Sequence, residues 1–129
     1  MAVIHAASFT HPRPWSAAEI TALLDSRFCF AITQDRGFLI GRCIAGEAEL
    51  LTMAVAPDAR RGGLGAELVA GFLHESGARG ATQAFLEVAS DNPTAQRIYA
   101  RAGFAVTGRR RGYYAPGIDA VLMGRDLPG

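Results

Sequence analysis

The chain has 129 residues, of which 50% are hydrophobic and 19% are charged. This composition excludes a disordered chain and is sufficient for a real core, so we expect a single domain that spans residues 1–129. The formal net charge is +1, from 13 basic and 12 acidic side chains, so neither nucleic acid nor an anionic membrane is an expected partner. The apolar runs are too short to span a bilayer.

Cysteines and histidines give no sign of a metal site. Cys29 and Cys43 both fall in predicted strands. A disulfide between neighbouring strands stays open, but because we find no secretory signal we favour two free thiols in a cytoplasmic protein. His5, His11 and His74 have no metal-ligand spacing with the cysteines, so we expect no metal.

The first half of the chain predicts two short helices followed by three strands. A Pro-rich breaker separates the helices, and Ser16 with Glu19 forms a capping box for the second one. Alternating and β-branched apolar runs bounded by turn residues then predict the strands. In order, we expect helices at residues 2–9 and 16–24, and strands at 28–33, 38–44 and from residue 50 to the break at Pro57.

The second half predicts a helix-strand-helix unit followed by two strands. Asn92 and Pro93 are favoured at a helix start, and Gly103 is favoured after a helix end. We expect helices from residue 64 to about 76 and from 93 to 102, strands at 84–88, 104–109 and 118–123, and a loop, or a partly extended segment, at 110–117. Meander strands before a βαβ centre indicate an α/β fold with a mixed sheet and helices on both faces.

A glycine-rich turn joins the third predicted strand to the long helix and reads Arg60-Arg61-Gly62-Gly63-Leu64-Gly65. Free backbone N–H groups at a helix start can bind a pyrophosphate, and the two arginines add positive charge beside it. Taken alone, the glycines serve equally well for tight packing between a strand and a helix. No Lys-Ser/Thr pair follows and the G-x-G-x-x-G spacing is absent, so neither common nucleotide-binding motif is present.

This turn resembles the (Q/R)-x-x-G-x-(G/A) signature of the GCN5-related N-acetyltransferases (GNAT), in which the loop binds the pyrophosphate of acetyl-coenzyme A. The resemblance implies a mostly antiparallel central sheet flanked by helices. That fold usually has a strand before its first helix, and here either that strand is missing or another segment takes its role. If it is missing, residues 28–33 form a sheet edge, in a monomer or homodimer. It implies cofactor contacts at Met53, Ala54, Val55, Arg60, Arg61, Gly62, Gly63, Leu64, Gly65, Ala66 and Asn92.

Two residues are candidates for proton transfer. Leu86-Glu87-Val88, followed by Asn92 and by Ile98-Tyr99 before Gly103-Phe104, resembles the ribosomal-protein-alanine acetyltransferases. The resemblance implies that Glu87 is the base, acting through water, and that Tyr99 is the acid that protonates the leaving thiolate. Alternation along the strand would instead place Glu87 on a solvated face, and Tyr99 would also suit the apolar side of its helix.

Arg109-Arg110-Arg111-Gly112-Tyr113-Tyr114 resembles the R-R-x-Y-Y segment that lines the peptide groove of the same enzymes, and Trp15 falls in a matching P-W-S segment. The resemblance therefore implies substrate contacts at Trp15, Tyr113 and Tyr114. The predicted function is transfer of acetyl from acetyl-CoA to a protein N-terminal amine, such as that of a small-subunit ribosomal protein. The alternatives are a small-molecule amine acceptor or a coenzyme-A-binding module without catalysis.

Overall fold

The structure, a computed structural model, describes residues 16–18, 26–56 and 63–128. Its centre is a six-stranded mixed sheet in the order β1-β2-β3-β4-β6-β5. The pair β3 and β4 is parallel and the other neighbours are antiparallel, as the sequence predicted. The strands are β1 (Cys29–Gln34), β2 (Gly37–Ile44), β3 (Glu47–Val55), β4 (Gln83–Ala89), β5 (Ala105–Ala115) and β6 (Ile118–Asp126).

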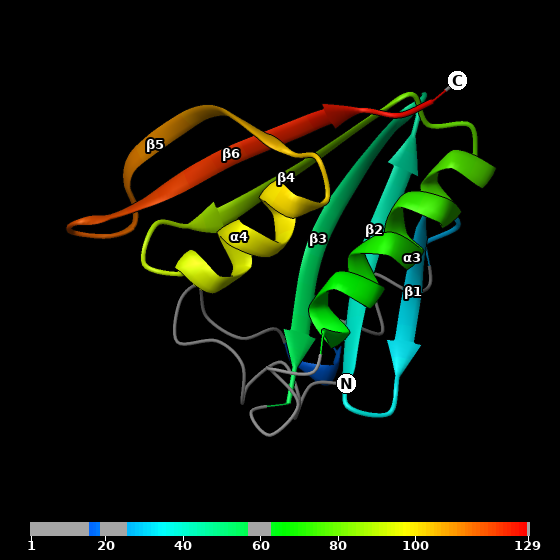
Figure 1. The fold of residues 1–129 in the computed structure, drawn as a ribbon, viewed down its shortest axis with the longest axis horizontal. Coiled ribbons are helices and arrows are strands. Elements are labelled where there is room, and N and C mark those ends of the chain that lie inside the picture. The colour runs from blue at the N-terminus through cyan, green and yellow to red at the C-terminus, as the bar shows by residue number, and fades with distance from the viewer. Residues whose placement is uncertain (1–15, 19–25, 57–62, 129) are drawn as a thin grey trace.

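Two helices, α3 (Leu64–Ala78) and α4 (Pro93–Arg101), pack side by side on one face of the sheet (Figure 1). The hydrophobic core lies between them and the strands, and it includes Leu39, Leu68, Phe72 and Leu86. Close approach of α3 depends on Gly41, where a Cβ atom would lie 2.8 Å from the Phe72 ring. The two helices predicted before residue 25 lie outside the described residues, except that residues 17 and 18 are helical.

Strand β1 forms one edge of the sheet, and in the part of the chain that the structure describes no strand precedes it. This confirms the expectation that the segment around residues 28–33 is an edge strand. Cys29 lies in this strand and Cys43 in its neighbour, and both thiols are free, as favoured from the sequence.

Strand boundaries differ from the prediction at two hairpins. The predicted end of β5 at residue 109 is wrong, because this strand continues to Ala115. The segment 110–117, expected to be a loop that is extended in part, has a turn only at Pro116 and Gly117. Pairing of Ala115 with Ile118 in β6 makes this extension, and such a partner cannot be read from local sequence. Strand β3 begins at Glu47 because Ala45 and Gly46, with φ of 52° and 83°, make a tight two-residue turn.

The parallel pair opens at the carboxyl ends of its strands. The ladder between β3 and β4 runs from Glu47–Gln83 to Leu50–Leu86 and ends there. On their outer sides, β2 still pairs with β3 as far as Val55, and β6 still pairs with β4 as far as Ala89. The two strands therefore diverge beyond residues 50 and 86 (Figure 1). A crevice at the carboxyl ends of strands, next to a βα turn, is a common ligand position in α/β proteins.

Candidate active site

Helix α3 begins beside this opening without a side-chain cap. Its N-cap residue is Gly63, whose φ of 79° is in the left-handed region that glycine adopts readily. The N–H groups of Leu64, Gly65 and Ala66 precede the first intrahelical bond, which Glu67 donates to the Gly63 carbonyl at 3.1 Å. A helix start with free donors and the positive end of the dipole can bind an anion.

Gly65 has a packing role of its own. A Cβ atom at this position would lie 2.8 Å from Cδ1 of Ile98 on α4 and 3.7 Å from Cε of Met53 on β3. The start of α3 therefore packs closely against both elements. The tight packing that the sequence offered as one interpretation of the glycine-rich turn is present at Gly65, and anion binding by the turn stays a prediction.

The predicted cofactor strand forms one side of the opening. Met53 and Ala54 are buried in β3 and Val55 is half-buried. Their ladder partners lie on β2, namely Leu39, Phe38 and Gly37, and no ladder joins this stretch to β4. An extended ligand could pair with a strand in this position by β-augmentation.

The two predicted catalytic residues lie on opposite faces of the sheet. Leu86 and Val88 point into the core beside Tyr99, so alternation along β4 places Glu87 on the other face. The Glu87 side chain is 31% exposed, in agreement with the alternative that strand alternation places it on a solvated face. Tyr99 is 5% exposed. Both residues adjoin the point at which β4 separates from β3.

Tyr114 links the two faces electrostatically. Burial raises the pKa of Tyr99 well above its usual value, and the proximity of Tyr114 adds to the effect. The pKa of Tyr114 is also raised, first by burial and then by Glu87 and Tyr113, while Arg110 opposes the shift. Both phenols therefore stay protonated at neutral pH.

Arg110 connects the carboxylate to the exposed tyrosine. Its Nη2 lies 3.6 Å from Oε1 of Glu87, and its guanidinium carbon lies 5.4 Å from the ring centroid of Tyr113. The rings of Tyr113 and Tyr114 pack edge to face, with centroids 5.2 Å apart. The Arg110–Tyr114 segment therefore lies beside Glu87, although 23 or more positions separate them in the sequence.

Asp119 organises this segment, and the sequence reasoning missed it. Between the pairs Arg110–Ala120 and Ala115–Ile118 the register of β5 and β6 shifts, so residues 111–114 bulge opposite Asp119. Oδ1 of Asp119 accepts a hydrogen bond from the Gly112 N–H at 2.9 Å, and Oδ2 lies 3.3 Å from Nε of Arg109. A single charge within the apolar run Ile118–Met123 was the signal that could have identified it.

The remaining predicted site residues divide into two groups. Asn92 is the N-cap of α4, and its side chain accepts a hydrogen bond from the Ala95 N–H at 3.1 Å, as predicted for a cap. Its side-chain nitrogen has no part in that bond and could contact a ligand. Trp15, Arg60, Arg61 and Gly62 lie outside the described residues.

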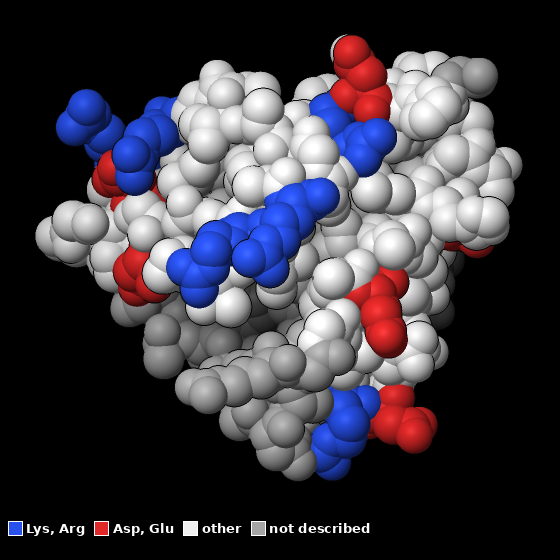
Figure 2. Space-filling model, in the orientation of Figure 1, with Lys and Arg blue, Asp and Glu red and all other residues white. Residues whose placement is uncertain are grey.

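Exposed cations border the opening on the helical face. Arg97 and Arg101 are exposed one turn apart on α4. Figure 2 shows basic side chains gathered over this helix and a hollowed surface beside it. Among the described residues, no cluster of His, Cys, Asp and Glu could hold a metal ion, and no helix is long and apolar enough to cross a membrane.

Comparison with known proteins agrees with this geometry. The sequence model of the protein family described as "Acetyltransferase (GNAT) family" matches residues 2–104 of this chain. The chain is 33% identical to the [ribosomal protein bS18]-alanine N-acetyltransferase of Escherichia coli, over 95% of this chain and 87% of the relative.

Two solved structures share the fold at similar identity. The ribosomal-protein-S18-alanine N-acetyltransferase from Escherichia coli matches with a TM-score of 0.87 at 29% identity, over 99% of this chain and 86% of that one. Ard1 from Thermoplasma volcanium matches with a TM-score of 0.81 at 28% identity, over 93% and 85% of the two chains. The chain therefore belongs to the GNAT acetyltransferase family and is an acetyl-CoA-dependent N-acetyltransferase.

Proposed function

We propose that the enzyme acetylates the N-terminal α-amine of a polypeptide, with a small-subunit ribosomal protein that begins with alanine as the implied substrate. The observation that carries this proposal is the cluster of Glu87, Arg110, Tyr113 and Tyr114 at the open end of β4. The Glu87 carboxylate of this cluster lies on the face opposite α3 and α4, so an acceptor that approaches it and a cofactor bound at α3 can reach the opening from different sides. The name of the Escherichia coli relative supports the same acceptor class.

On the helical face, the residues fit an anionic, extended cofactor. The uncapped start of α3 at Gly63–Ala66 provides N–H donors for a pyrophosphate, with Arg60, Arg61 and Gly62 as the adjoining part of the motif. The backbone of Met53, Ala54 and Val55 provides a strand for the pantetheine arm, and the Asn92 amide is a further contact. Acetyl-CoA supplies the acetyl group as a thioester.

Glu87 is the proposed general base. Its carboxylate takes a proton from the acceptor ammonium through a water molecule, which leaves the amine nitrogen free to attack the thioester carbonyl carbon. Arg110, whose Nη2 lies 3.6 Å from Oε1, orients this carboxylate at the open end of β4. Tyr113 and Tyr114, with Trp15, are the proposed contacts for the first residues of the acceptor.

Tyr99 is the proposed donor to the departing thiolate. Because burial raises its pKa, the phenol still holds its proton when the carbon–sulfur bond breaks. The same shift makes it a weaker acid than a free tyrosine, so its contribution is a hydrogen bond donated to the departing sulfur. The proton that the thiolate takes from the phenol is replaced on Tyr99 by the proton that the amine loses. Two free thiols and the reducing conditions that they need fit a cytoplasmic site of action.

Thiol release from acetyl-CoA tests the acceptor class. The acceptors are pentapeptides with N-terminal alanine or serine, the same peptides with a formylated N-terminus, and a panel of polyamines and aminoglycosides. We expect turnover of the free peptides and none of the formylated ones, with mass spectrometry placing the acetyl group on the α-amine. Turnover of small amines while peptides are ignored would refute the proposal, and cofactor binding without any turnover would indicate a non-catalytic module.

Glu87→Gln tests the base. We expect kcat to fall by about 10²- to 10⁴-fold, the usual contribution of a general base, while the Kd for acetyl-CoA changes little. Glu75→Gln is the matched control, because it removes the same charge from an exposed ion pair on α3, on the other face of the sheet. Wild-type kcat in Glu87→Gln would remove Glu87 from the mechanism.

A further inference from the structure

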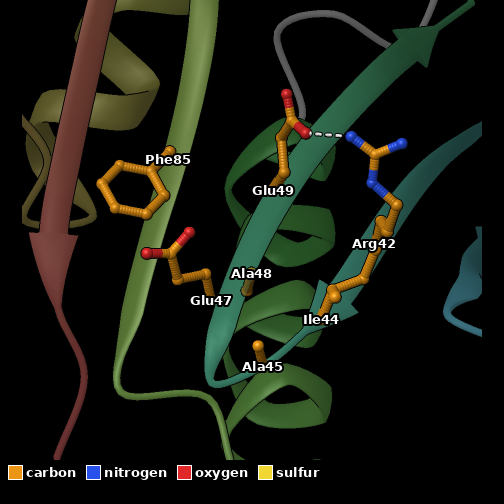
Figure 3. A pocket seen from close by; sticks show the side chains of 7 residues that line it. All are labelled: Arg42, Ile44, Ala45, Glu47, Ala48, Glu49 and Phe85. Carbon is orange, nitrogen blue, oxygen red and sulfur yellow. Dashed lines mark hydrogen bonds and ion pairs between the residues drawn. The ribbon is translucent and has the colours of Figure 1, made fainter.

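A hollow of about 410 Å³ lies at the paired end of β3 and β4, on the face opposite α3 (Figure 3). It is formed by the end of the β2–β3 hairpin and the start of β4, and its side chains include Arg42, Ile44, Glu47, Glu49 and Phe85. This is the face on which Glu87 lies. The hollow is therefore separate from the cofactor side of the opening but continuous with the face that an acceptor would approach.

The hollow combines exposed apolar surface with negative charge. Phe85 and Ile44 are 37% and 45% exposed, which is high for large apolar side chains. The Phe85 ring lies against β6, where a Cβ atom at Gly124 would approach its Cδ1 to 3.3 Å. The Glu47 carboxylate points toward this ring (Figure 3).

The charges in the hollow do not cancel. Arg42 is paired with Glu49 through Nη2 and Oε1. Within the described part of the chain Glu47 has no ion-pair partner, so one positive and two negative side chains leave the hollow with an excess negative charge. A carboxylate beside an aromatic face attracts a cation, and adjoining apolar surface suits the methylene stem of lysine or arginine.

The distance between Glu87 and the hollow determines which residue of an extended acceptor peptide can contact the hollow. Phe85 and Glu87 are alternate residues of one strand, so they lie roughly 6.6 Å apart along it. Glu47 pairs with Gln83, four residues from Glu87, which adds up to about 13 Å along β4. An extended peptide covers at most about 3.3–3.6 Å per residue, so its third or fourth residue reaches the hollow.

We propose that this hollow is an acceptor subsite that binds the lysine or arginine side chain of the third or fourth residue of the polypeptide whose N-terminus is acetylated. The Phe85 ring and the Glu47 carboxylate bind the cationic group, and Ile44 contacts the stem. The subsite rests on the proposed function, because it requires a polypeptide acceptor, and it selects among such acceptors by charge. Glu47 and Phe85 are therefore specificity-determining residues, at a distance from the reacting atoms.

Competing peptides measure this selectivity. Two sets of pentapeptides begin with alanine and carry arginine, citrulline or glutamate at either the third or the fourth position, and kcat/KM is determined for each. For wild-type enzyme we expect arginine to be preferred over citrulline by about five- to thirtyfold in one set, the range for an exposed ion pair with a cation–π contact. Glutamate should be the poorest residue in that set.

Variants assign the preference to the hollow. Glu47→Gln and Phe85→Leu should each reduce the arginine-to-citrulline ratio severalfold, and Glu47→Lys should make glutamate better than arginine. Glu75→Gln, with the same charge change on the other face, should keep the wild-type ratio. Each ratio compares two substrates on one variant, so partial unfolding of a variant cancels.

Two results would overturn the subsite while the proposed function stands: equal kcat/KM for arginine and citrulline in both sets, or an arginine preference that is undiminished in Glu47→Gln and Phe85→Leu. No turnover of any free peptide would refute the proposed function and the subsite together.

Discussion

Asp119→Ala should weaken the bulge that carries Tyr113 and Tyr114, the two proposed acceptor contacts. The variant removes the hydrogen bond from the Gly112 N–H and the ion pair with Arg109. It leaves the backbone of residue 119 in place, where its N–H donates to Ser90 Oγ at 2.8 Å and its carbonyl accepts from the Ser90 N–H at 2.9 Å. The change therefore acts on the 111–114 segment and spares the junction with β4.

The expected loss of stability follows from these two contacts. A hydrogen bond to a charged group contributes about 1.5–3 kcal/mol. The Arg109 side chain is half exposed, so its ion pair adds less than about 1 kcal/mol. We expect the free energy of unfolding to fall by about 2 kcal/mol, which for a chain of 129 residues lowers Tm by about 7 °C.

Denaturation and kinetics check this prediction together. KM for a peptide acceptor should rise in Asp119→Ala, because Tyr113 and Tyr114 lose their fixed position, while the Kd for acetyl-CoA stays near the wild-type value. Asp119→Asn is the matched control, since its amide oxygen can still accept from Gly112, and it should lose less than about 1 kcal/mol. Wild-type stability and KM in Asp119→Ala, or an equal loss in both variants, would refute this role for the carboxylate.

Two further predictions concern stability. Ala45 has a φ of 52°, so Ala45→Gly should relieve the left-handed strain and raise Tm by a few degrees, for a net gain of about 0.5–1 kcal/mol; a lower Tm in thermal denaturation would contradict this. Burial and Tyr114 raise the pKa of Tyr99 above the unfolded value of about 10. The contribution of this neutral phenol to the free energy of unfolding is therefore complete below about pH 10 and is lost as the pH rises above it. Between pH 8 and pH 11, the free energy of unfolding measured in urea should therefore fall by about 1.4 kcal/mol less in Tyr99→Phe than in wild type. Identical pH dependence in both proteins would show that the pKa of Tyr99 is not raised by folding.

The local sequence pattern was sufficient to predict most helices and strands and to identify acetyl-CoA as the acetyl donor. Pro93 after Asn92 and Gly103 after the helix marked the bounds of α4, because caps depend on neighbouring residues. The glycine-rich turn before Leu64 marked the start of α3 for the same reason. The error at residues 110–117 arose because three arginines and a glycine resemble a loop, whereas the strand there is formed by pairing with β6.

By itself, the sequence determined which residue types were available for the chemistry: a carboxylate in an apolar strand, a tyrosine on a helix and a basic, aromatic segment near the end. Only the tertiary structure decided that Glu87 and Tyr99 lie on opposite faces of the sheet, that Arg110 reaches Glu87, and that Glu47 lies beside Phe85 without an ion-pair partner among the described residues. These relations depend on which strands become neighbours and where β3 and β4 separate. Strand pairing joins distant segments, so the physical cause of the site's geometry is non-local.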